Sequence, residues 1–458
     1  MKSDQQAPED RGHLVGIIFF ILGLGTLLPW NFFMTATKYF ENRLDTSEWS
    51  NGTVVTSREY YFTNWMTLLS QLPLLLFTLL NSFLYQRLSE KVRIGGSLVF
   101  ILLLFILTAV LVTVAMEKDT FFSVTMATIW FINSFGAVLQ GSLFGLVGLL
   151  PQKYSAVFMS GQGLAGTFAA VAMLLAIYSE VDNRSAALGY FITPCVGTLI
   201  TLMSYVLLPH IAYAQYYFNR FKRYEEEVNN VLLVNVTEME PMETNKLNGH
   251  AKSNGTVEHG SVESAETKQV LHTLEQSKAQ DARSSVTQVL KKIWVMAFCV
   301  TFVFTVTLSV FPAVTVDVQS AFKGRWQMYF TPVCCFLAFN IMDWFGRTIT
   351  SVLQWPPKES RFFPALVVAR VVFIPLLMMC NVQKRTNMPV LFPHDAVFVL
   401  IMVLFSVSSG YFVCLSMSYA PQLVEPKDAE RAGALMTFFL ALGLSLGAAL
   451  SFPLRTLV

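Results

Sequence analysis

The sequence predicts an all-α polytopic membrane protein with eleven transmembrane helices arranged in two bundles. Hydrophobic residues make up 54% of the 458 residues, whereas charged residues make up only 14%. The apolar residues gather in runs of about 20, the length that a helix needs to cross the hydrocarbon core of a bilayer. A helix also bonds its own backbone polar groups, which a lipid-exposed segment must do. This pattern excludes an ordinary globular chain.

The order of the spans predicts the domain organisation. We expect eleven spans, at residues 14–37, 65–86, 94–115, 122–149, 158–179, 188–208, 290–313, 327–354, 364–381, 396–419 and 433–455. The stretch between the sixth and seventh spans is rich in Glu, Asn, Ser, Thr and Lys, the composition of a disordered linker. The chain then divides into an N-terminal bundle (1–209, with a first outer loop at 38–64), a cytoplasmic linker (210–289) and a C-terminal bundle (290–458). This six-plus-five division resembles the architecture of major-facilitator transporters.

The loop charges predict how the chain sits in the membrane. With a cytoplasmic N-terminus, the short cytoplasmic connections carry more Lys and Arg than the outer ones, as the positive-inside rule requires. An odd number of spans then places the C-terminus outside the cell. Two glycosylation sequons, Asn51-Gly-Thr and Asn183-Arg-Ser, fall in outer loops, so we expect glycans at Asn51 and Asn183.

The first span contains a predicted bend. Pro29 removes a backbone hydrogen bond and exposes carbonyl groups, and Trp30 and Asn31 follow it directly. In a structural interpretation Trp30 is a packing residue and Asn31 is the partner of a freed carbonyl. In a functional interpretation the indole of Trp30 stacks on a flat heterocycle. The residues alone leave both interpretations open.

Amide side chains mark the second and fourth spans. Gln71 precedes Pro73 in span two, and Gln140 lies in span four. A primary amide both donates and accepts hydrogen bonds, which suits the edge of a purine or pyrimidine. Glycines at four-residue spacing, such as Gly443 and Gly447, permit close contact between helices and favour a packing role.

The eighth span carries the most unusual polar residues. Asp343 and Arg347 lie near its middle at i and i+4, in the order that favours an ion pair on one helix face, and Asn340 lies one turn earlier. A charge at that depth costs at least about 2.5–3.5 kcal/mol, so an unpaired one would be hard to retain. These side chains either fasten the helix to its neighbours or line a wet cavity. Arg370, in span nine, lies about two turns from the predicted cytoplasmic end, and we expect it to reach the interface or pair with a loop acid.

Several classes of function are excluded by what the spans lack. The cysteines form no Cys-x-x-Cys motif, the histidines lie in loops or near span ends, and there is no Walker A motif. We therefore expect no metal, no cofactor and no enzymatic activity. Asp343 is the only acidic residue deep in a predicted span, which leaves no spare buried proton relay. The residues favour passive, alternating-access transport of a neutral polar solute.

Four stretches taken together resemble the equilibrative nucleoside transporters. They are Gly23-Leu-Gly-Thr-Leu-Leu-Pro-Trp-Asn-Phe-Phe33, Leu139-Gln-Gly-Ser-Leu-Phe-Gly145, Ser160-Gly-Gln-Gly-Leu-Ala-Gly166 and Phe339-Asn-Ile-Met-Asp-Trp-Phe-Gly-Arg347. The resemblance covers nearly every span, and spans two and six look closest to the second vertebrate subtype. It implies sodium-independent, facilitated diffusion of nucleosides through eleven helices.

The resemblance also implies roles for individual residues. Gln140 should hydrogen-bond the nucleobase, and Asp343 and Arg347 should hold the ribose hydroxyls. Gly136 sits where sensitivity to nucleoside-analogue inhibitors varies within the family. The remaining expected contacts come from span one (Leu27, Trp30, Asn31, Met34), from span two on the base side (Gln71), and from the walls of the site (Phe311, Phe336, Asn340, Leu444).

The expected substrates are purine and pyrimidine nucleosides, with nucleobases as a candidate second class. The resemblance implies a plasma-membrane protein, basolateral in polarised cells, that contacts lipid and needs neither nucleic acid nor an obligate protein partner. Two alternatives stay open at this point. One is a proton-coupled, major-facilitator-like carrier of another small polar solute, and the other is a membrane receptor that transports nothing.

Overall fold

The computed structural model describes residues 8–45, 47–50, 53–56, 60, 62–84, 88–179, 183–220, 285–383, 385 and 387–458. Within these residues, ten helices are long and apolar enough to cross a membrane, and a shorter apolar segment, Phe362–Met378, lies at the predicted ninth span. All eleven predicted spans therefore have a helical counterpart. The prediction of an all-α polytopic membrane protein is confirmed.

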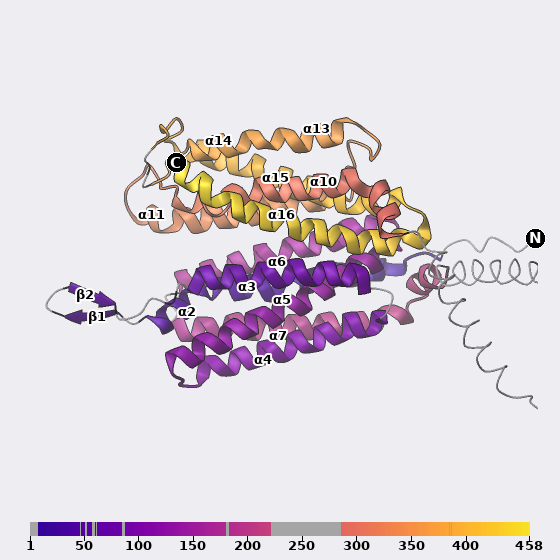
Figure 1. The fold of residues 1–458 in the computed structure, drawn as a ribbon, viewed down its shortest axis with the longest axis horizontal. Coiled ribbons are helices and arrows are strands. Elements are labelled where there is room, and N and C mark those ends of the chain that lie inside the picture. The colour runs from indigo at the N-terminus through magenta and orange to yellow at the C-terminus, as the bar shows by residue number, and fades with distance from the viewer. Residues whose placement is uncertain are drawn as a thin grey trace, which may run out of the picture.

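The first six spans form one bundle, drawn in indigo to magenta in Figure 1. Its helices are α1 (Leu14–Thr35), α3 (Phe62–Leu84), α4 (Ser97–Thr113), α5 (Lys118–Gly148), α6 (Gln152–Tyr178) and α7 (Asn183–Leu207). Helix α1 packs on α6 and α7, and α5 packs on α3 and α4. The contact between α1 and α6 is very close, because a Cβ atom at Gly23 would lie 2.0 Å from the Phe158 carbonyl oxygen.

The last five spans form the second bundle, drawn in orange to yellow. Its helices are α10 (Val286–Val310), α11 (Arg325–Phe330), α12 (Ala338–Ile349), α13 (Phe362–Ala369), α14 (Phe373–Met378), α15 (Asp395–Tyr419) and α16 (Ala429–Leu457). A π-helical stretch, Thr331–Leu337, joins α11 to α12, so these form one span. Helix α10 packs on α16, where Gly443 and Gly447 lie against backbone carbonyls of α10, in agreement with the packing role predicted for them.

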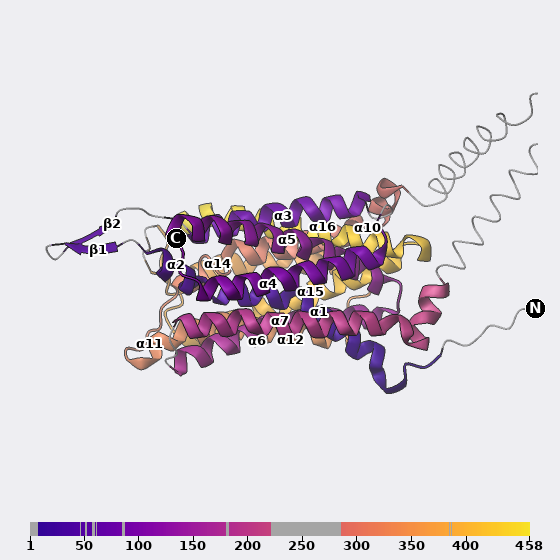
Figure 2. The ribbon, with the colours of Figure 1, turned by 90° about the horizontal axis from the view of Figure 1, so that it is seen from below.

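The two ends of the molecule differ. At one end the short helix α2 (Thr37–Leu44) leads to a hairpin of β1 (Ser47–Ser50) and β2 (Thr53–Thr56), which projects from the bundles in Figures 1 and 2. We call this the hairpin end. The opposite end, where α7 leaves its bundle and α10 enters the other, we call the linker end. The sequence pattern did not predict the hairpin, which lies within the predicted first outer loop.

The predicted linker lies mostly outside the described residues. Of the range 210–289, the structure describes 210–220, which are largely helical, and 285–289, where α10 begins. Ser285 and Gln288 form a reciprocal capping box at this start, which fixes the first turn of α10. Helix α10 thus begins at Val286.

The two bundles meet along two seams. Helix α16 packs on α3 and α5, and α6 packs on α12 and α15. At the linker end of the first seam, a Cβ atom at Gly433 would lie 2.4 Å from the Phe144 carbonyl oxygen. Arg93 also forms a 3.5 Å ion pair there with Glu430 of the other bundle, and the Arg93 side chain is only 4% exposed. These contacts hold the bundles together at the linker end.

Candidate functional site

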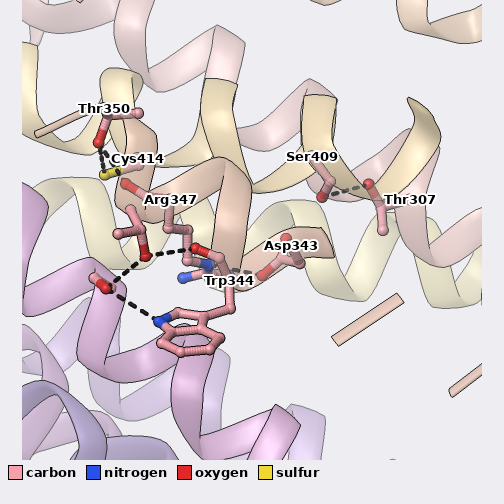
Figure 3. Close-up of polar contacts among 9 residues, drawn as sticks. Thr307, Asp343, Trp344, Arg347, Thr350, Ser409 and Cys414 are labelled. Atoms are coloured by element: carbon pink, nitrogen blue, oxygen red, sulfur yellow. Dashed lines mark hydrogen bonds and ion pairs between the residues drawn. The ribbon is translucent and has the colours of Figure 1, made fainter. Parts of the chain in front are cut away.

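Asp343 and Arg347 form the predicted pair on α12. The Arg347 Nε atom donates to Asp343 Oδ2 at 2.7 Å, and the residues are 8% and 7% exposed (Figure 3). Their spacing places both side chains on one face of the helix. Because both are buried, each charge is tolerated there only while this charge-assisted hydrogen bond pairs it with the other. The i, i+4 prediction is confirmed.

The pair keeps unused hydrogen-bonding capacity. The described contacts of the two side chains include only the Nε–Oδ2 bond, so Asp343 Oδ1 and the two terminal nitrogens of Arg347 have no partner among the described residues. Each of these atoms keeps some accessible surface, because none is among the unpartnered polar atoms that are fully buried. They therefore remain within reach of a ligand, and they offer one strong acceptor beside strong donors.

Glycines hold the pair in place from two sides. A Cβ atom at Gly410 of α15 would lie 2.0 Å from the Asp343 carbonyl oxygen, so the backbones of α12 and α15 touch. On the other side, a Cβ atom at Gly163 of α6 would lie 3.0 Å from Arg347 Cδ. Contacts this close leave the pair little freedom to move, which pre-organises its unused donors and acceptor.

A short hydrogen-bonded chain crosses the seam beside the pair. The Trp344 indole nitrogen donates to the Ser160 hydroxyl at 3.2 Å, and this hydroxyl lies 2.8 Å from that of Thr348 (Figure 3). Ser160 belongs to α6, whereas Trp344 and Thr348 belong to α12. The two bundles are therefore joined by side-chain hydrogen bonds directly next to the charged pair. The sequence analysis did not single out Trp344 or Thr348.

Asn340 lies one turn before the pair and, like Arg347, packs against α6. Its amide nitrogen donates to the Phe336 carbonyl at 2.9 Å. Its Oδ1 atom lies against Gly166 of α6, 2.1 Å from where a Cβ atom would be, and Asn31 Oδ1 lies 3.6 Å from the same point. Asn340 and Asn31 thus meet at Gly166, where α1, α6 and α12 converge. Asn340 and Arg347 face the same seam, because Gly166 and Gly163, which lie against them, are one turn apart on α6.

The span-one residues surround the predicted bend. Asn31 donates to the Leu27 carbonyl at 2.8 Å, whereas Pro29 leaves the carbonyl of Gly25 without its helical partner. The structural interpretation of Asn31 was therefore wrong in detail, because Asn31 bonds a different carbonyl. Trp30 is half-buried and stacks on Phe33 at 6.1 Å, which occupies one face of the indole. The other two span-one residues of the predicted site are Leu27, half-buried, and Met34, 42% exposed.

The base-side residues carry unpaired amides. Gln140 of α5 is 7% exposed, and its side chain has no hydrogen-bond partner among the described residues. Gly136 lies one turn earlier on the same face, and a Cβ atom there would meet nothing within 4 Å. In α3, Gln71 Oε1 is buried without a partner. Two amides that lack protein partners fit a ligand edge that alternates donors and acceptors.

Two of the residues predicted to form a wall of the site are aromatic side chains of the C-terminal bundle that lie together. The rings of Phe311 and Phe336 lie 5.9 Å apart, and Phe311 also stacks on Phe339 at 3.9 Å. Leu444 of α16 is half-buried against the main hydrophobic core. The described contacts join Phe311 to Phe336 and bring Asn340 and Asn31 to the same glycine, and they do not join Gln140, Gln71 or Leu444 to the charged pair.

Arg370 is a buried residue that the sequence analysis misjudged. It was expected to reach the membrane interface, and this prediction is wrong because Arg370 is 2% exposed. It lies in a 3-10 turn, Arg370–Val372, that breaks the ninth span between α13 and α14. The sequence could have indicated this burial, because Arg370 lies at the middle of a short apolar segment, Phe362–Met378, where even a long side chain does not reach either membrane interface.

The glycosylation predictions remain untested. Asn51 lies outside the described residues, between the two strands of the hairpin. Asn183 begins α7 at the hairpin end, and its side chain is not described. Among the described residues, no group of three or more His, Cys, Asp or Glu side chains could hold a metal ion.

Comparison with known proteins identifies the family. A family model described as "Nucleoside transporter" matches residues 126–456. The chain is also 51% identical to equilibrative nucleoside transporter 2 of Rattus norvegicus, and the match covers 99% of each chain. The chain belongs to the nucleoside transporter family. Human equilibrative nucleoside transporters 2 and 1 are 51% and 47% identical to it, over 99% and 98% of this chain and 99% of each relative.

The fold of this nucleoside transporter family member also matches a solved structure. A proton:xylose symporter of the major facilitator superfamily, solved with 6-bromo-6-deoxy-D-glucose bound, superimposes with a TM-score of 0.56. The match covers 97% of this chain and 89% of the other at 11% identity. At that identity the likeness concerns the fold alone, and it agrees with the predicted major-facilitator-like arrangement.

Proposed function

We propose that this chain carries purine and pyrimidine nucleosides across a membrane by facilitated diffusion, without coupling to sodium. The observation that carries the proposal is the buried pair of Asp343 and Arg347 with its unused acceptor and donors, in a chain of the nucleoside transporter family. Two vicinal hydroxyls can donate to the free oxygen of Asp343 and accept from the terminal nitrogens of Arg347 together. The pair would then clamp the ribose without moving a net charge.

The nucleobase would be held from the other bundle. Gln140 and Gln71 supply amides that match the donors and acceptors on a base edge, and Trp30 supplies a flat face for stacking. Leu27, Asn31 and Met34 would complete that side. Phe311, Phe336, Asn340 and Leu444 would form the wall on the C-terminal side, and nucleobases alone would form a second, weaker class of substrate.

The linker end would face the cytoplasm. The described Lys and Arg residues near that end, among them Lys91, Arg93, Lys153 and Lys427, support this orientation by the positive-inside rule. The hairpin end, with glycans at Asn51 and Asn183, would then face outward in the plasma membrane, as would the C-terminus. Gly136 would set inhibitor sensitivity, because its open surroundings admit a bulky ligand there. Neither an obligate partner nor a cofactor is part of the proposal.

The proposal is tested by exchange of labelled uridine in proteoliposomes that contain the purified chain and no ion gradient. The wild-type chain should exchange uridine, and Asp343→Asn and Gln140→Ala should each lose most of the flux while remaining folded. Matched controls are Asp317→Asn and Gln152→Ala. Asp317 forms only an exposed ion pair at the hairpin end, and Gln152 begins α6 at the linker end, so both should keep wild-type flux.

Three results would contradict the proposal in different ways. Absence of uridine exchange by the wild-type chain would favour a receptor that transports nothing. Accumulation of uridine driven by an imposed proton gradient would favour a proton-coupled carrier. Full flux in both Asp343→Asn and Gln140→Ala would leave nucleoside transport in place but refute the assigned site.

A further inference from the structure

Arg370 is a buried cation that no carboxylate neutralises directly. Its guanidinium donates to the Val303 carbonyl at 3.0 Å, the Thr307 hydroxyl at 3.1 Å, the Phe405 carbonyl at 3.2 Å and the Ser408 hydroxyl at 3.1 Å. These bonds use four of its five N–H groups. No described acidic group forms an ion pair with it, and only neutral dipoles and the Phe405 ring, 5.4 Å away, compensate its charge.

The surrounding hydroxyls are arranged to accept from this arginine. The Thr307 hydroxyl donates its proton to the Val303 carbonyl at 2.7 Å, so it can only accept from Arg370 and from Ser409, which lies 3.2 Å away (Figure 3). Ser408 likewise donates to the Phe405 carbonyl at 2.9 Å and accepts from Arg370. The turn that breaks the ninth span is thus tied to α10 and α15 by a saturated network.

A neutral donor could tie these helices together at lower cost. Burying a guanidinium without a carboxylate is expensive, and a structural fastening does not need the charge. The chain retains the charge close to the proposed substrate clamp. Ser409, bonded to Thr307, adjoins Gly410, whose backbone touches that of Asp343.

The charges buried around the clamp therefore do not cancel. Asp343 contributes one negative charge, and Arg347 and Arg370 contribute two positive charges. The other described ion pairs of the C-terminal bundle lie at its ends, such as Arg455 with Asp317 at the hairpin end and Lys427 with Glu425 at the linker end. A substrate at the clamp would meet an excess of one positive charge in a poorly polarisable environment.

We propose that Arg370 is a specificity-determining residue that excludes cationic permeants, which rests on the nucleoside transport proposed above. A buried arginine close to a transport path raises the electrostatic energy of a cation there and leaves neutral solutes unaffected, even where its guanidinium does not line the path. For two like charges about 10 Å apart at an effective dielectric constant of about 20, Coulomb repulsion lowers occupancy at least about tenfold. The ligand class so selected is the neutral nucleoside.

The test compares two uridine analogues of nearly equal size. 5-Aminomethyluridine is cationic at neutral pH and 5-hydroxymethyluridine is neutral, so the ratio of their fluxes in proteoliposomes reports on charge alone. The wild-type chain should carry the neutral analogue at least about tenfold faster. Arg370→Gln should bring the ratio close to one, whereas Arg370→Lys, which keeps the charge, should retain the wild-type ratio. Ser408→Ala removes a hydrogen bond without removing charge, so it should also retain the ratio.

The outcomes separate charge selection from a structural role. A residue that only fastens helices would lower both fluxes equally in Arg370→Gln, and an unchanged ratio in that variant would overturn the proposal. A wild-type ratio near one would overturn it without any variant, so poor folding of Arg370→Gln does not remove the test. Failure of the wild-type chain to exchange uridine in the same vesicles would refute the proposed function instead.

Discussion

Asp343 is only 8% exposed, so replacing Arg347 by glutamine would leave a buried carboxylate without an ion-pair partner. Breaking a buried pair by removing one partner costs about 3–5 kcal/mol, and side chains this buried receive little help from solvent. We therefore expect Arg347→Gln and Asp343→Asn each to destabilise the chain by about 3 kcal/mol or more. In the double variant neither member of the pair is charged, and two amides at i, i+4 can still bond, so most of the loss should be recovered.

Across the two single variants and the double variant, thermal stability and uridine flux should respond differently. Thermal unfolding of the purified chain in detergent would show both single variants melting several degrees below the wild type, and the double variant close to it. Uridine exchange should be low in all three variants, because the double variant is stable but lacks the charged acceptor and donors for ribose. Recovery of flux together with stability in the double variant would refute the ribose clamp and reduce the pair to a structural fastening.

Two further predictions concern the seams between the bundles. Gly166→Ala places a Cβ atom 2.1 Å from Asn340 Oδ1, so the Asn340 side chain must turn away from its place in the proposed site and uridine flux should fall a few fold. Gly189→Ala has open space at its Cβ position and should keep full flux, and equal flux in the two variants would contradict a role for Asn340 in the site. Glu430→Gln removes the ion pair with Arg93 at the linker end, so the two bundles should separate there more often. Cysteines introduced at this end should then react faster with a polar thiol reagent, and unchanged labelling rates would show that the pair does not hold this end closed.

The spans and the charged pair could be predicted because local spacing encodes them. A run of apolar residues determines a membrane helix whatever its neighbours are, and two opposite charges at i, i+4 must face the same way. Asp343 and Arg347 therefore appear where the sequence analysis placed them. The glycines of α16 follow the same logic, because their four-residue spacing marks one face of one helix.

The rest depended on contacts between distant segments. Asn340 bonds the Phe336 carbonyl of its own helix and lies against Gly166 of α6, and spacing along one helix does not specify that neighbour. Arg370 was judged by its distance from a span end, whereas its partners come from α10 and α15, more than thirty residues away along the chain. Short polar loops such as the hairpin lack the long periodic pattern on which hydropathy depends.

The position of the clamp on a single helix has a consequence for energetics. The 2.7 Å bond between Asp343 and Arg347 stays the same however the two bundles tilt, whereas the bonds of Trp344 and Thr348 to Ser160 cross the seam and must break when it opens. A ribose held by the pair would then bind with the same free energy whichever face of the membrane is open. A ligand with equal affinity for two states shifts neither. Binding of substrate would then leave the balance between the outward-open and inward-open states unchanged.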